Sequence, residues 1–286
     1  LLDVSVFRQD RPLLSGVNWS FHAGEHWVLL GPNGSGKSTM LSLVALQNWP
    51  TTGRMTAFGE GVPGRPVAPL QKKIGLFETR EAESLCYNYP GLTVLDVILF
   101  GLTGKLPYYS APGPEQIDAA EKLILHHLSI PSDTRFAVLS SGERRRALLL
   151  KSIAARPDIL LLDEPFANLD PVRREAALVL IDEVVEREGL TLVLATHRLE
   201  EAVSLCDHLL PLVEEDGVST GTAQPLAQVL SESGAPTLVS GTLREAAGTL
   251  AFCYRGQTLR VKAAPFLRGE DRAGPAAALI DREDVR

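Results

Sequence analysis

Cysteine, aromatic residues and long apolar segments are all scarce in this sequence of 286 residues. The three cysteines, Cys86, Cys206 and Cys253, lie far apart and form no Cys-x-x-Cys pair. This spacing argues against a disulfide framework and against a zinc site built from cysteine pairs, and we expect free thiols in a reducing compartment. No apolar run approaches the roughly 18 residues that a membrane-spanning helix needs. We therefore expect any membrane crossing to belong to another chain.

Positive charge is scarce as well. The chain has 28 Lys and Arg residues against 35 Asp and Glu residues, which gives a formal net charge of −7. A protein that holds nucleic acid through its phosphates usually presents a net basic surface. We expect no nucleic-acid partner, despite a local basic cluster at Arg144–Arg146.

The sequence does contain short apolar runs, typical of strands, that alternate with segments of helical spacing. The expected strands are 2–7, 13–21, 26–30, 73–77, 159–162 and 191–195, and the expected core helices are 38–46 and 173–188. The first two strands flank a polar turn and should form an antiparallel β edge. The later, continuously apolar runs fit buried parallel strands. The pattern predicts an α/β fold with a mixed sheet core.

A helical block interrupts this pattern, and a hairpin ends it. Residues 93–155 are mostly of helical spacing, and we predict an inserted helical subdomain at about 84–155. Asp216-Gly217 suits a type I′ turn. It predicts a hairpin that joins 209–213 to 218–220 and completes the α/β domain.

The end of the chain differs in composition, with more Gly, Ala and Arg and only short strand-like pieces. These pieces are 237–243, 250–254, 258–261 and 278–280. We predict an α/β domain at 1–231, followed at 232–286 by a small, mostly β C-terminal accessory region.

A glycine-rich segment lies between the strand at 26–30 and the helix at 38–46. From Gly31 to Ser38 it matches the P-loop pattern G-x-x-x-x-G-K-[ST]. Glycines let backbone N–H groups face phosphates, and a helix N-terminus favours an anion. We expect Lys37 to reach the β- and γ-phosphates and the Ser38 hydroxyl to ligate Mg²⁺. The residues expected to contact the nucleotide are Gly31, Pro32, Asn33, Gly34, Ser35, Gly36, Lys37, Ser38 and Thr39.

Two carboxylates follow the apolar run 159–162. We expect Asp163 to hold Mg²⁺ through water, and Glu164 to orient and deprotonate the attacking water as general base. A structural alternative is that Asp163 only caps the following helix. Together with the P-loop, the pair predicts an ATPase with ATP and Mg²⁺ as cofactors.

Three further segments resemble parts of one known family. Leu139–Glu143 (Leu-Ser-Ser-Gly-Glu) resembles the signature segment of ATP-binding cassette (ABC) ATPases, Phe166–Asp170 resembles their D-loop, and Thr196-His197 resembles their switch histidine. With the P-loop and the Walker B segment Ile159–Glu164, they stand in the order of that family across residues 31–197. The chain therefore resembles an ABC ATPase with the P-loop NTPase fold.

The resemblance implies a head-to-tail homodimer in which each ATP lies between the P-loop of one domain and the signature of the other. The signature residues expected at the nucleotide are Ser140, Ser141, Gly142 and Glu143. They would offer hydroxyl and N–H donors at a helix N-terminus to the γ-phosphate across the interface. The resemblance also places Asp170 at the nucleotide, and it implies that His197 hydrogen-bonds the γ-phosphate and positions the water.

The sequence departs from the family at two places. A glutamine normally ends the strand 74–77, but here Glu78-Thr79 follows it, and either residue could ligate Mg²⁺; we include Thr79 in the metal site. The adenine platform is commonly a tyrosine upstream of the P-loop. Here Phe7 or Arg8 could stack on the base, although Phe7 fits a core strand position equally well.

The resemblance leaves two functions open. The leading one is the energising subunit of a membrane transporter, cytoplasmic and peripheral on the inner face of the cell membrane, whose helical block 84–135 receives a transmembrane permease subunit. Gly24–Trp27 and Thr93–Gly101 are similar to a subgroup that includes molybdate- and iron-complex-type importer ATPases and photorepair-type relatives. The alternative is a soluble ABC ATPase of the regulatory, translation or repair type. A single cassette on the chain favours the transporter.

Overall fold

A computed structural model shows how these segments fold. It describes residues 1–280 except 10, 65, 107–110, 129, 168, 216–217, 234–236, 247–248, 255–256 and 261–273. Side chains are described as far as residue 229, apart from the same gaps and 214–219. No helix in this described part is long and apolar enough to span a membrane.

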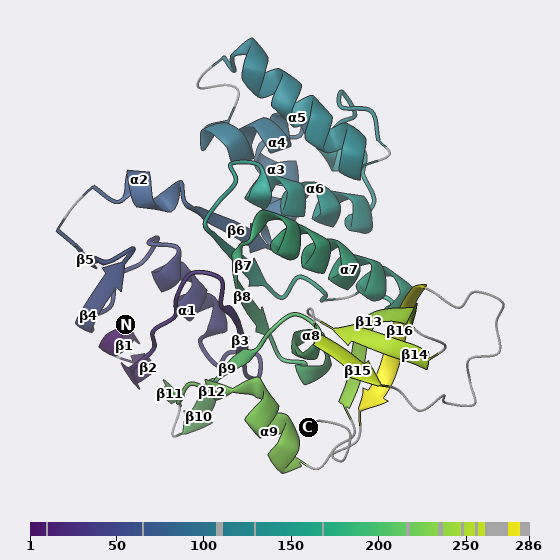
Figure 1. The fold of residues 1–286 in the computed structure, drawn as a ribbon. Coiled ribbons are helices and arrows are strands. Elements are labelled where there is room, and N and C mark those ends of the chain that lie inside the picture. Colours follow the sequence, from purple (N-terminus) through teal and green to yellow (C-terminus); the bar gives the residue numbers. More distant parts are fainter. Residues whose placement is uncertain are drawn as a thin grey trace.

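A six-stranded mixed sheet forms the centre of the molecule (Figure 1). Its strands, in spatial order, are β12 (Gln224–Pro225), β9 (His208–Pro211), β3 (His26–Leu30), β8 (Thr191–Thr196), β7 (Ile159–Asp163) and β6 (Ile74–Glu78). All neighbours pair in parallel except β12, which is antiparallel to β9. The predicted α/β fold with a mixed sheet core is confirmed.

The central strands are buried on both faces because their apolar side chains alternate between two cores. On β7, Leu160 and Leu162 belong to one core and Leu161 to the other. The helices α6 (Ser141–Ile153) and α7 (Pro171–Glu188) contribute to the first core, and α1 (Lys37–Val44) contributes to the second. The continuous apolar runs in the sequence are thus explained by a sheet covered on both sides.

A second sheet of six strands forms the mostly antiparallel edge. Its strands, in spatial order, are β10 (Val213–Glu215), β11 (Val218–Thr220), β2 (Arg11–Val17), β1 (Leu2–Arg8), β4 (Thr52–Ala57) and β5 (Glu60–Val62). Neighbours in this sheet pair antiparallel except β11 and β2, which are parallel. The predicted hairpin is present as the β10–β11 pair, and its Asp216-Gly217 turn lies outside the described residues. One detail of the prediction is wrong: the expected strand 209–213 is divided at Leu212, because β9 pairs with β3 in the central sheet.

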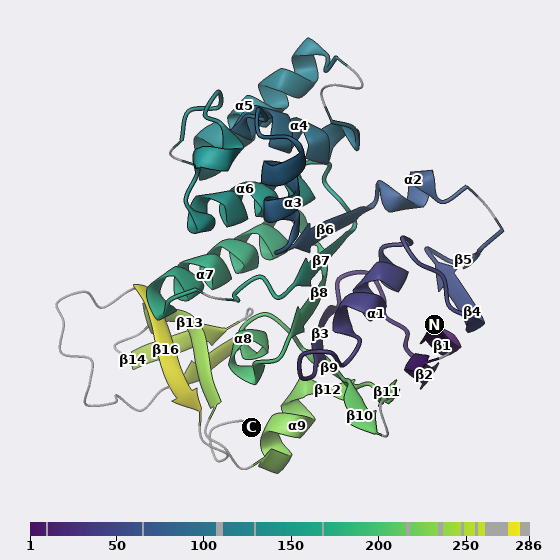
Figure 2. The same ribbon diagram turned by 180° about the vertical axis from the view of Figure 1, so that it is seen from behind.

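The inserted helical block lies beyond the β6 end of the central sheet (Figures 1 and 2). It contains α3 (Glu81–Asn88), α4 (Val94–Thr103), α5 (Pro114–His127) and α6, while the short α2 (Ala68–Gln71) precedes β6. Thr93 starts α4 with a capping box, since its hydroxyl accepts from the Asp96 N–H and the Asp96 carboxylate accepts from the Thr93 N–H. Helices α4 and α6 approach so closely that a Cβ atom on Gly101 would lie 2.1 Å from the Lys151 carbonyl oxygen.

The C-terminal region forms a sheet of its own. After α9 (Leu226–Ser233), four antiparallel strands stand in the order β15 (Gln257–Arg260), β14 (Thr249–Tyr254), β13 (Thr237–Ala246) and β16 (Gly274–Ile280). This mostly β region agrees with the sequence prediction, and β13 contacts α8 (Leu199–Val203). The domain boundary at 231/232 stays a prediction, and α9 runs across that position.

Candidate functional site

The P-loop connects the end of β3 to the start of α1. Lys37 folds back over the loop and donates from Nζ to the carbonyl oxygens of Gly31 at 2.8 Å and Pro32 at 3.0 Å. Gly36 precedes α1 in a left-handed conformation with φ 82°, which favours glycine. A Cβ atom there would also lie 2.8 Å from the Leu14 side chain. The loop is therefore a tight cradle that depends on glycine.

The chemistry of the loop fits a phosphate group. Gly34 has φ 91° and open space around it, so its backbone can approach a ligand. The Ser35 hydroxyl is fully buried and has no hydrogen-bond partner among the described residues. These features and the helix N-terminus at Lys37 form an anion-binding arrangement of the P-loop type.

Asp163 lies at the end of β7, opposite the start of α1. Its carboxylate oxygen Oδ2 accepts a hydrogen bond of 2.7 Å from the Ser38 hydroxyl. Burial raises the pKa of Asp163, the neighbouring Glu164 charge adds to this rise, and the Ser38 hydrogen bond and the Lys37 charge oppose it. Two hard oxygen ligands thus lie side by side, which fits Mg²⁺ held by one carboxylate, one hydroxyl, water and phosphates. The alternative that Asp163 only caps a helix lacks support, because its described partner is Ser38.

Glu164 contacts two other parts of the site, the P-loop and the segment formed by β8 and the histidine that follows it. Its carboxylate is 3.2 Å from Lys37 Nζ and 2.9 Å from His197 Nδ1. Its backbone has φ 48°, a region that residues other than glycine rarely adopt, and its N–H donates to the carbonyl of Ala195 on β8. The P-loop lysine, the expected base and the expected switch histidine are therefore in direct contact.

A buried glutamate holds the segment around His197, and the sequence analysis did not identify it. Glu201 of α8 is 3% exposed and accepts a 2.6 Å hydrogen bond from the Thr196 hydroxyl. Arg174 lies 3.6 Å from the same carboxylate. Burial raises the pKa of Glu201, and the Thr196 hydrogen bond and the Arg174 charge oppose this rise. In the sequence, Glu201 is one of two adjacent acids in a short helix, and nothing local distinguishes it.

The signature segment opens α6. Ser140 caps this helix: its N–H donates to the Glu143 carboxylate at 2.8 Å, and its hydroxyl accepts from the Glu143 N–H at 3.3 Å. Hydrogen bonding of the Glu143 carboxyl group by the Ser140 side chain and backbone N–H lowers the pKa of Glu143. Ser141 and Gly142 follow in the first turn of α6. The signature thus presents a capped helix N-terminus.

In the D-loop, Asp170 starts α7. Its Oδ1 accepts from the Arg173 N–H at 3.0 Å, and Oδ2 lies 3.2 Å from the Arg173 side chain. Phe166 is buried in the core, and Asn168 lies outside the described residues. The described contacts of Asp170 are those of a helix cap, and its expected contact with a nucleotide stays a prediction.

Comparison with known proteins decides the family. The family model described as "ABC transporter" matches residues 14–167, which includes the P-loop, the signature and the Walker B segment. The chain belongs to the ABC transporter family. Members of this family bind and hydrolyse ATP, and the chain is therefore an ATPase.

Individual members of the family support this assignment. The chain is 30% identical over 234 residues to the uncharacterized ABC transporter ATP-binding protein YlmA of Bacillus subtilis. This match covers 80% of the chain and 88% of YlmA. It is 33% identical over 218 residues to the molybdate/tungstate import ATP-binding protein WtpC of Thermococcus kodakarensis, which covers 76% of the chain and 62% of that protein. The resemblance to molybdate-type ABC proteins is thus confirmed.

A solved structure of the family has the same fold. It is the dimeric structure of a post-hydrolysis state of the ATP-binding cassette MJ0796 bound to ADP and Pi. The TM-score is 0.65 at 25% identity, and the match covers 79% of this chain and 97% of that one.

Where the family has a glutamine at the end of β6, the chain has Glu78 and Thr79. Glu78 pairs in register with Asp163 on β7. Partial burial raises the pKa of Glu78, and the negative charges of Glu81 and Asp163 raise it further. The Thr79 hydroxyl is hydrogen-bonded to the backbone carbonyls of Asp163 and Glu164. Mg²⁺ ligation by Thr79 stays a prediction, and the described contacts of its hydroxyl are with the backbone carbonyls of Asp163 and Glu164.

The two candidates for the base platform lie on β1. Phe7 is 45% exposed and pairs with Pro12 of β2. The residue after Pro12 is Leu13, and its carbonyl oxygen lies near Gly36 of the P-loop. The alternative of a core position for Phe7 is therefore wrong. Arg8 is also exposed and pairs with Arg11. Both side chains are available to stack on a base.

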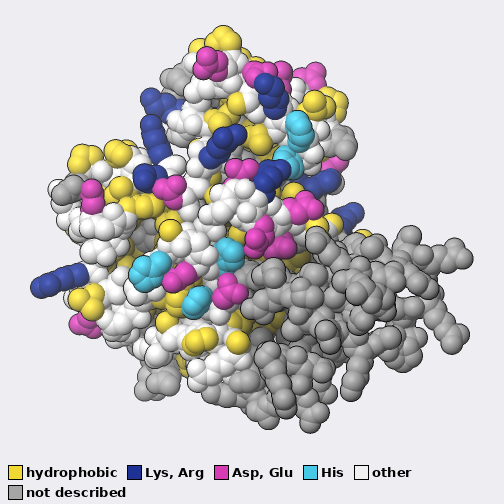
Figure 3. All heavy atoms as spheres, viewed as in Figure 1, with side chains coloured by type: hydrophobic (Ala, Val, Ile, Leu, Met, Phe, Trp, Pro, Cys, Tyr) yellow, Lys and Arg dark blue, Asp and Glu magenta, His cyan; other side chains and the backbone are white. Residues whose placement is uncertain are grey.

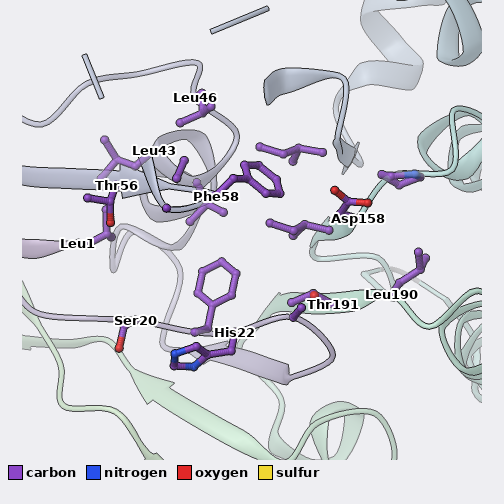
Figure 4. Close-up of a pocket in the computed structure, with 18 of the residues that line it drawn as sticks. Leu1, Ser20, His22, Leu43, Leu46, Thr56, Phe58, Asp158, Leu190 and Thr191 are labelled. Atoms are coloured by element: carbon purple, nitrogen blue, oxygen red, sulfur yellow. The ribbon is translucent and has the colours of Figure 1, made fainter. Parts of the chain in front are cut away.

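A cavity of about 690 Å³ lies apart from the P-loop (Figure 4). Leu43 of α1, Phe58 of the β4–β5 turn and His22 line it, together with Asp158 and Thr191. The last two residues stand at the amino-terminal ends of β7 and β8. The P-loop and the Walker B segment lie at the opposite, carboxyl ends of the strands, so this cavity is no part of the ATP site.

Proposed function

We propose that this chain is the ATP-hydrolysing subunit of a membrane transporter and that it works as a head-to-tail dimer. The observation that carries the dimer is the placement of the two phosphate-binding segments. The P-loop opens α1, the signature opens α6, and these helices pack on opposite faces of the central sheet. The signature at the start of α6 would therefore contact a γ-phosphate bound by another P-loop, and the P-loop of a second copy of the chain would supply that phosphate.

In the proposed site the P-loop binds the phosphates. Lys37 and the N–H groups at the start of α1 would contact the β- and γ-phosphates. Ser38 and Asp163, already 2.7 Å apart, would hold Mg²⁺, which when bound neutralises charge on the phosphates. Phe7 or Arg8 would cover the base.

Glu164 and His197 perform the proton chemistry in this proposal. The Glu164 carboxylate would accept a proton from the water that attacks the γ-phosphate. His197, 2.9 Å from this carboxylate, would hydrogen-bond the γ-phosphate and orient Glu164. The buried Thr196–Glu201 contact would keep the histidine segment in place.

A transmembrane permease is the proposed partner, with the chain peripheral on the inner face of the membrane. The family description and the import function named for WtpC support this partner. The helical block offers a surface for it, where Tyr87 of α3 is 88% exposed. On the face shown in Figure 3, basic side chains are scattered among acidic ones, which gives no support to a nucleic-acid partner.

Co-purification from gently solubilised membranes tests the partner. The tagged chain should retain an integral membrane protein, and Tyr87→Arg should lose it while nucleotide binding is unchanged. Val179→Arg, a partly exposed site on α7, is the matched control and should keep the partner. A wild-type chain that retains no membrane protein would contradict the transporter function and favour a soluble ABC ATPase.

A further inference from the structure

The Thr79 side chain joins the end of β6 to the backbone of the Walker B segment. Its hydroxyl Oγ1 lies 3.1 Å from the Asp163 carbonyl oxygen and 3.0 Å from the Glu164 carbonyl oxygen. A hydroxyl has one proton to donate, so the two carbonyls share it in a three-centre hydrogen bond. Thr79 itself is partly buried.

These two carbonyls flank a backbone position that needs support. Glu164 has φ 48°, and such a conformation in a residue other than glycine persists only when its surroundings hold it. The N–H group of Glu164 is held by the Ala195 carbonyl on β8 at 2.9 Å. Thr79 holds the carbonyl side, so the peptide units around the expected base are fixed from both neighbouring strands.

The same segment is also tied to the signature helix. Two residues after Thr79, the Glu81 carboxylate pairs with the Lys151 ammonium of α6, and both side chains are mostly buried. Lys151 also lies over the ring of Phe100 on α4. Residues 78–81 therefore connect the Walker B backbone with the helix that carries the signature.

We propose that Thr79 is a positioning residue for Glu164: its hydroxyl clamps the Asp163–Glu164 backbone and so sets the direction of the Glu164 carboxylate. The inference rests on the proposed role of Glu164 as general base. It gives the position after β6 a mechanical role in a chain that lacks the family's amide there, and it requires no metal ligation by Thr79.

The test compares Thr79→Val, which keeps the shape but removes the hydroxyl, with Thr79→Ser, which keeps the hydroxyl. Thr79→Val should lower kcat about 10-fold or more, because a small misplacement of a catalytic group has effects of this size. The KM for ATP, the Mg²⁺ concentration for half-maximal activity and the melting temperature should stay near wild type. Thr79→Ser should restore most of kcat. Amide hydrogen exchange at Asp163 and Glu164, measured without nucleotide, should be faster in Thr79→Val and normal in Thr79→Ser.

Three results would overturn the clamp: wild-type kcat in Thr79→Val, a loss that Thr79→Ser does not restore, or a defect that saturating Mg²⁺ removes. The last would show that Thr79 is a metal ligand. If Thr79→Val folds poorly, Thr79→Ala gives the same comparison with Thr79→Ser.

Glu164→Gln, measured in parallel, separates this inference from the proposed function. If Glu164→Gln keeps its turnover, the general-base role fails. If it loses turnover while Thr79→Val does not, only the clamp fails. In the double variant Glu164→Gln/Thr79→Val, turnover should be little lower than in Glu164→Gln alone, because both changes act through one carboxylate.

Discussion

The Lys37 ammonium lies 3.2 Å from a carboxylate oxygen of Glu164, and both side chains are mostly buried, with 6% and 20% exposure. This ion pair joins the phosphate cradle after β3 to the expected base at the end of β7. The lysine also donates to the carbonyls of Gly31 and Pro32. Lys37 therefore organises both the loop and the base.

Lys37→Ala should abolish ATP hydrolysis and weaken nucleotide binding. The cradle would lose its mobile positive charge, and Glu164 would lose a close cationic partner. We expect turnover to fall about 100-fold or more, the size of effect seen when a group that stabilises transition-state charge is removed. Steady-state ATPase assays and fluorescent-nucleotide titrations measure the two effects. Near-normal turnover would contradict the site assignment.

Glu164→Gln should keep ATP binding and remove the base, so the ATP-bound dimer should accumulate instead of resetting. Light scattering of the purified chain with ATP and Mg²⁺ should show a dimer for Glu164→Gln. The double variant Glu164→Gln/Lys37→Ala is the control, and it should remain a monomer. A strictly monomeric Glu164→Gln chain at high protein concentration would count against a shared site.

Gly101→Ala should destabilise the helical block although alanine normally favours a helix. A glycine inside a helix costs about 1 kcal/mol relative to alanine, but a Cβ atom on Gly101 would lie 2.1 Å from the Lys151 carbonyl oxygen. Separation of α4 and α6 should lower the free energy of unfolding by about 1–3 kcal/mol, measured by urea titration. Gly142→Ala, where a Cβ atom meets nothing within 4 Å, should cost no stability.

Removal of the C-terminal region should leave the ATP site intact. The expected catalytic residues end at His197, and β13–β16 form a separate sheet. A chain that ends near Ser231 should fold and bind ATP, while it loses dimer contacts or regulation. A second truncation after Ser233 keeps the whole of α9 and controls for damage to that helix. Melting temperature and ATP affinity check the prediction, and loss of cooperative folding in both truncations would place the region in the core.

Several features of the site were predictable because each lies in one short stretch of sequence. The P-loop needs glycines, a lysine and a serine at fixed spacing between a strand and a helix, and all of these occur within Gly31–Thr39. The capping box of the signature is likewise local, since Ser140 and Glu143 are three residues apart. Backbone turns, caps and strand periodicity depend on near neighbours, so the sequence alone determined the family, the mixed α/β fold and the expected reaction.

The contacts between these segments were decided only by the tertiary structure. Lys37 meets Glu164, Ser38 meets Asp163 and Thr79 clamps the Walker B backbone because parallel strands bring their carboxyl ends to one edge. No spacing in the sequence encodes these distances. The buried Glu201 could not be distinguished from its acidic neighbour for the same reason: its role depends on burial and on the Thr196 hydroxyl, which exist only once β8 and α8 have packed together.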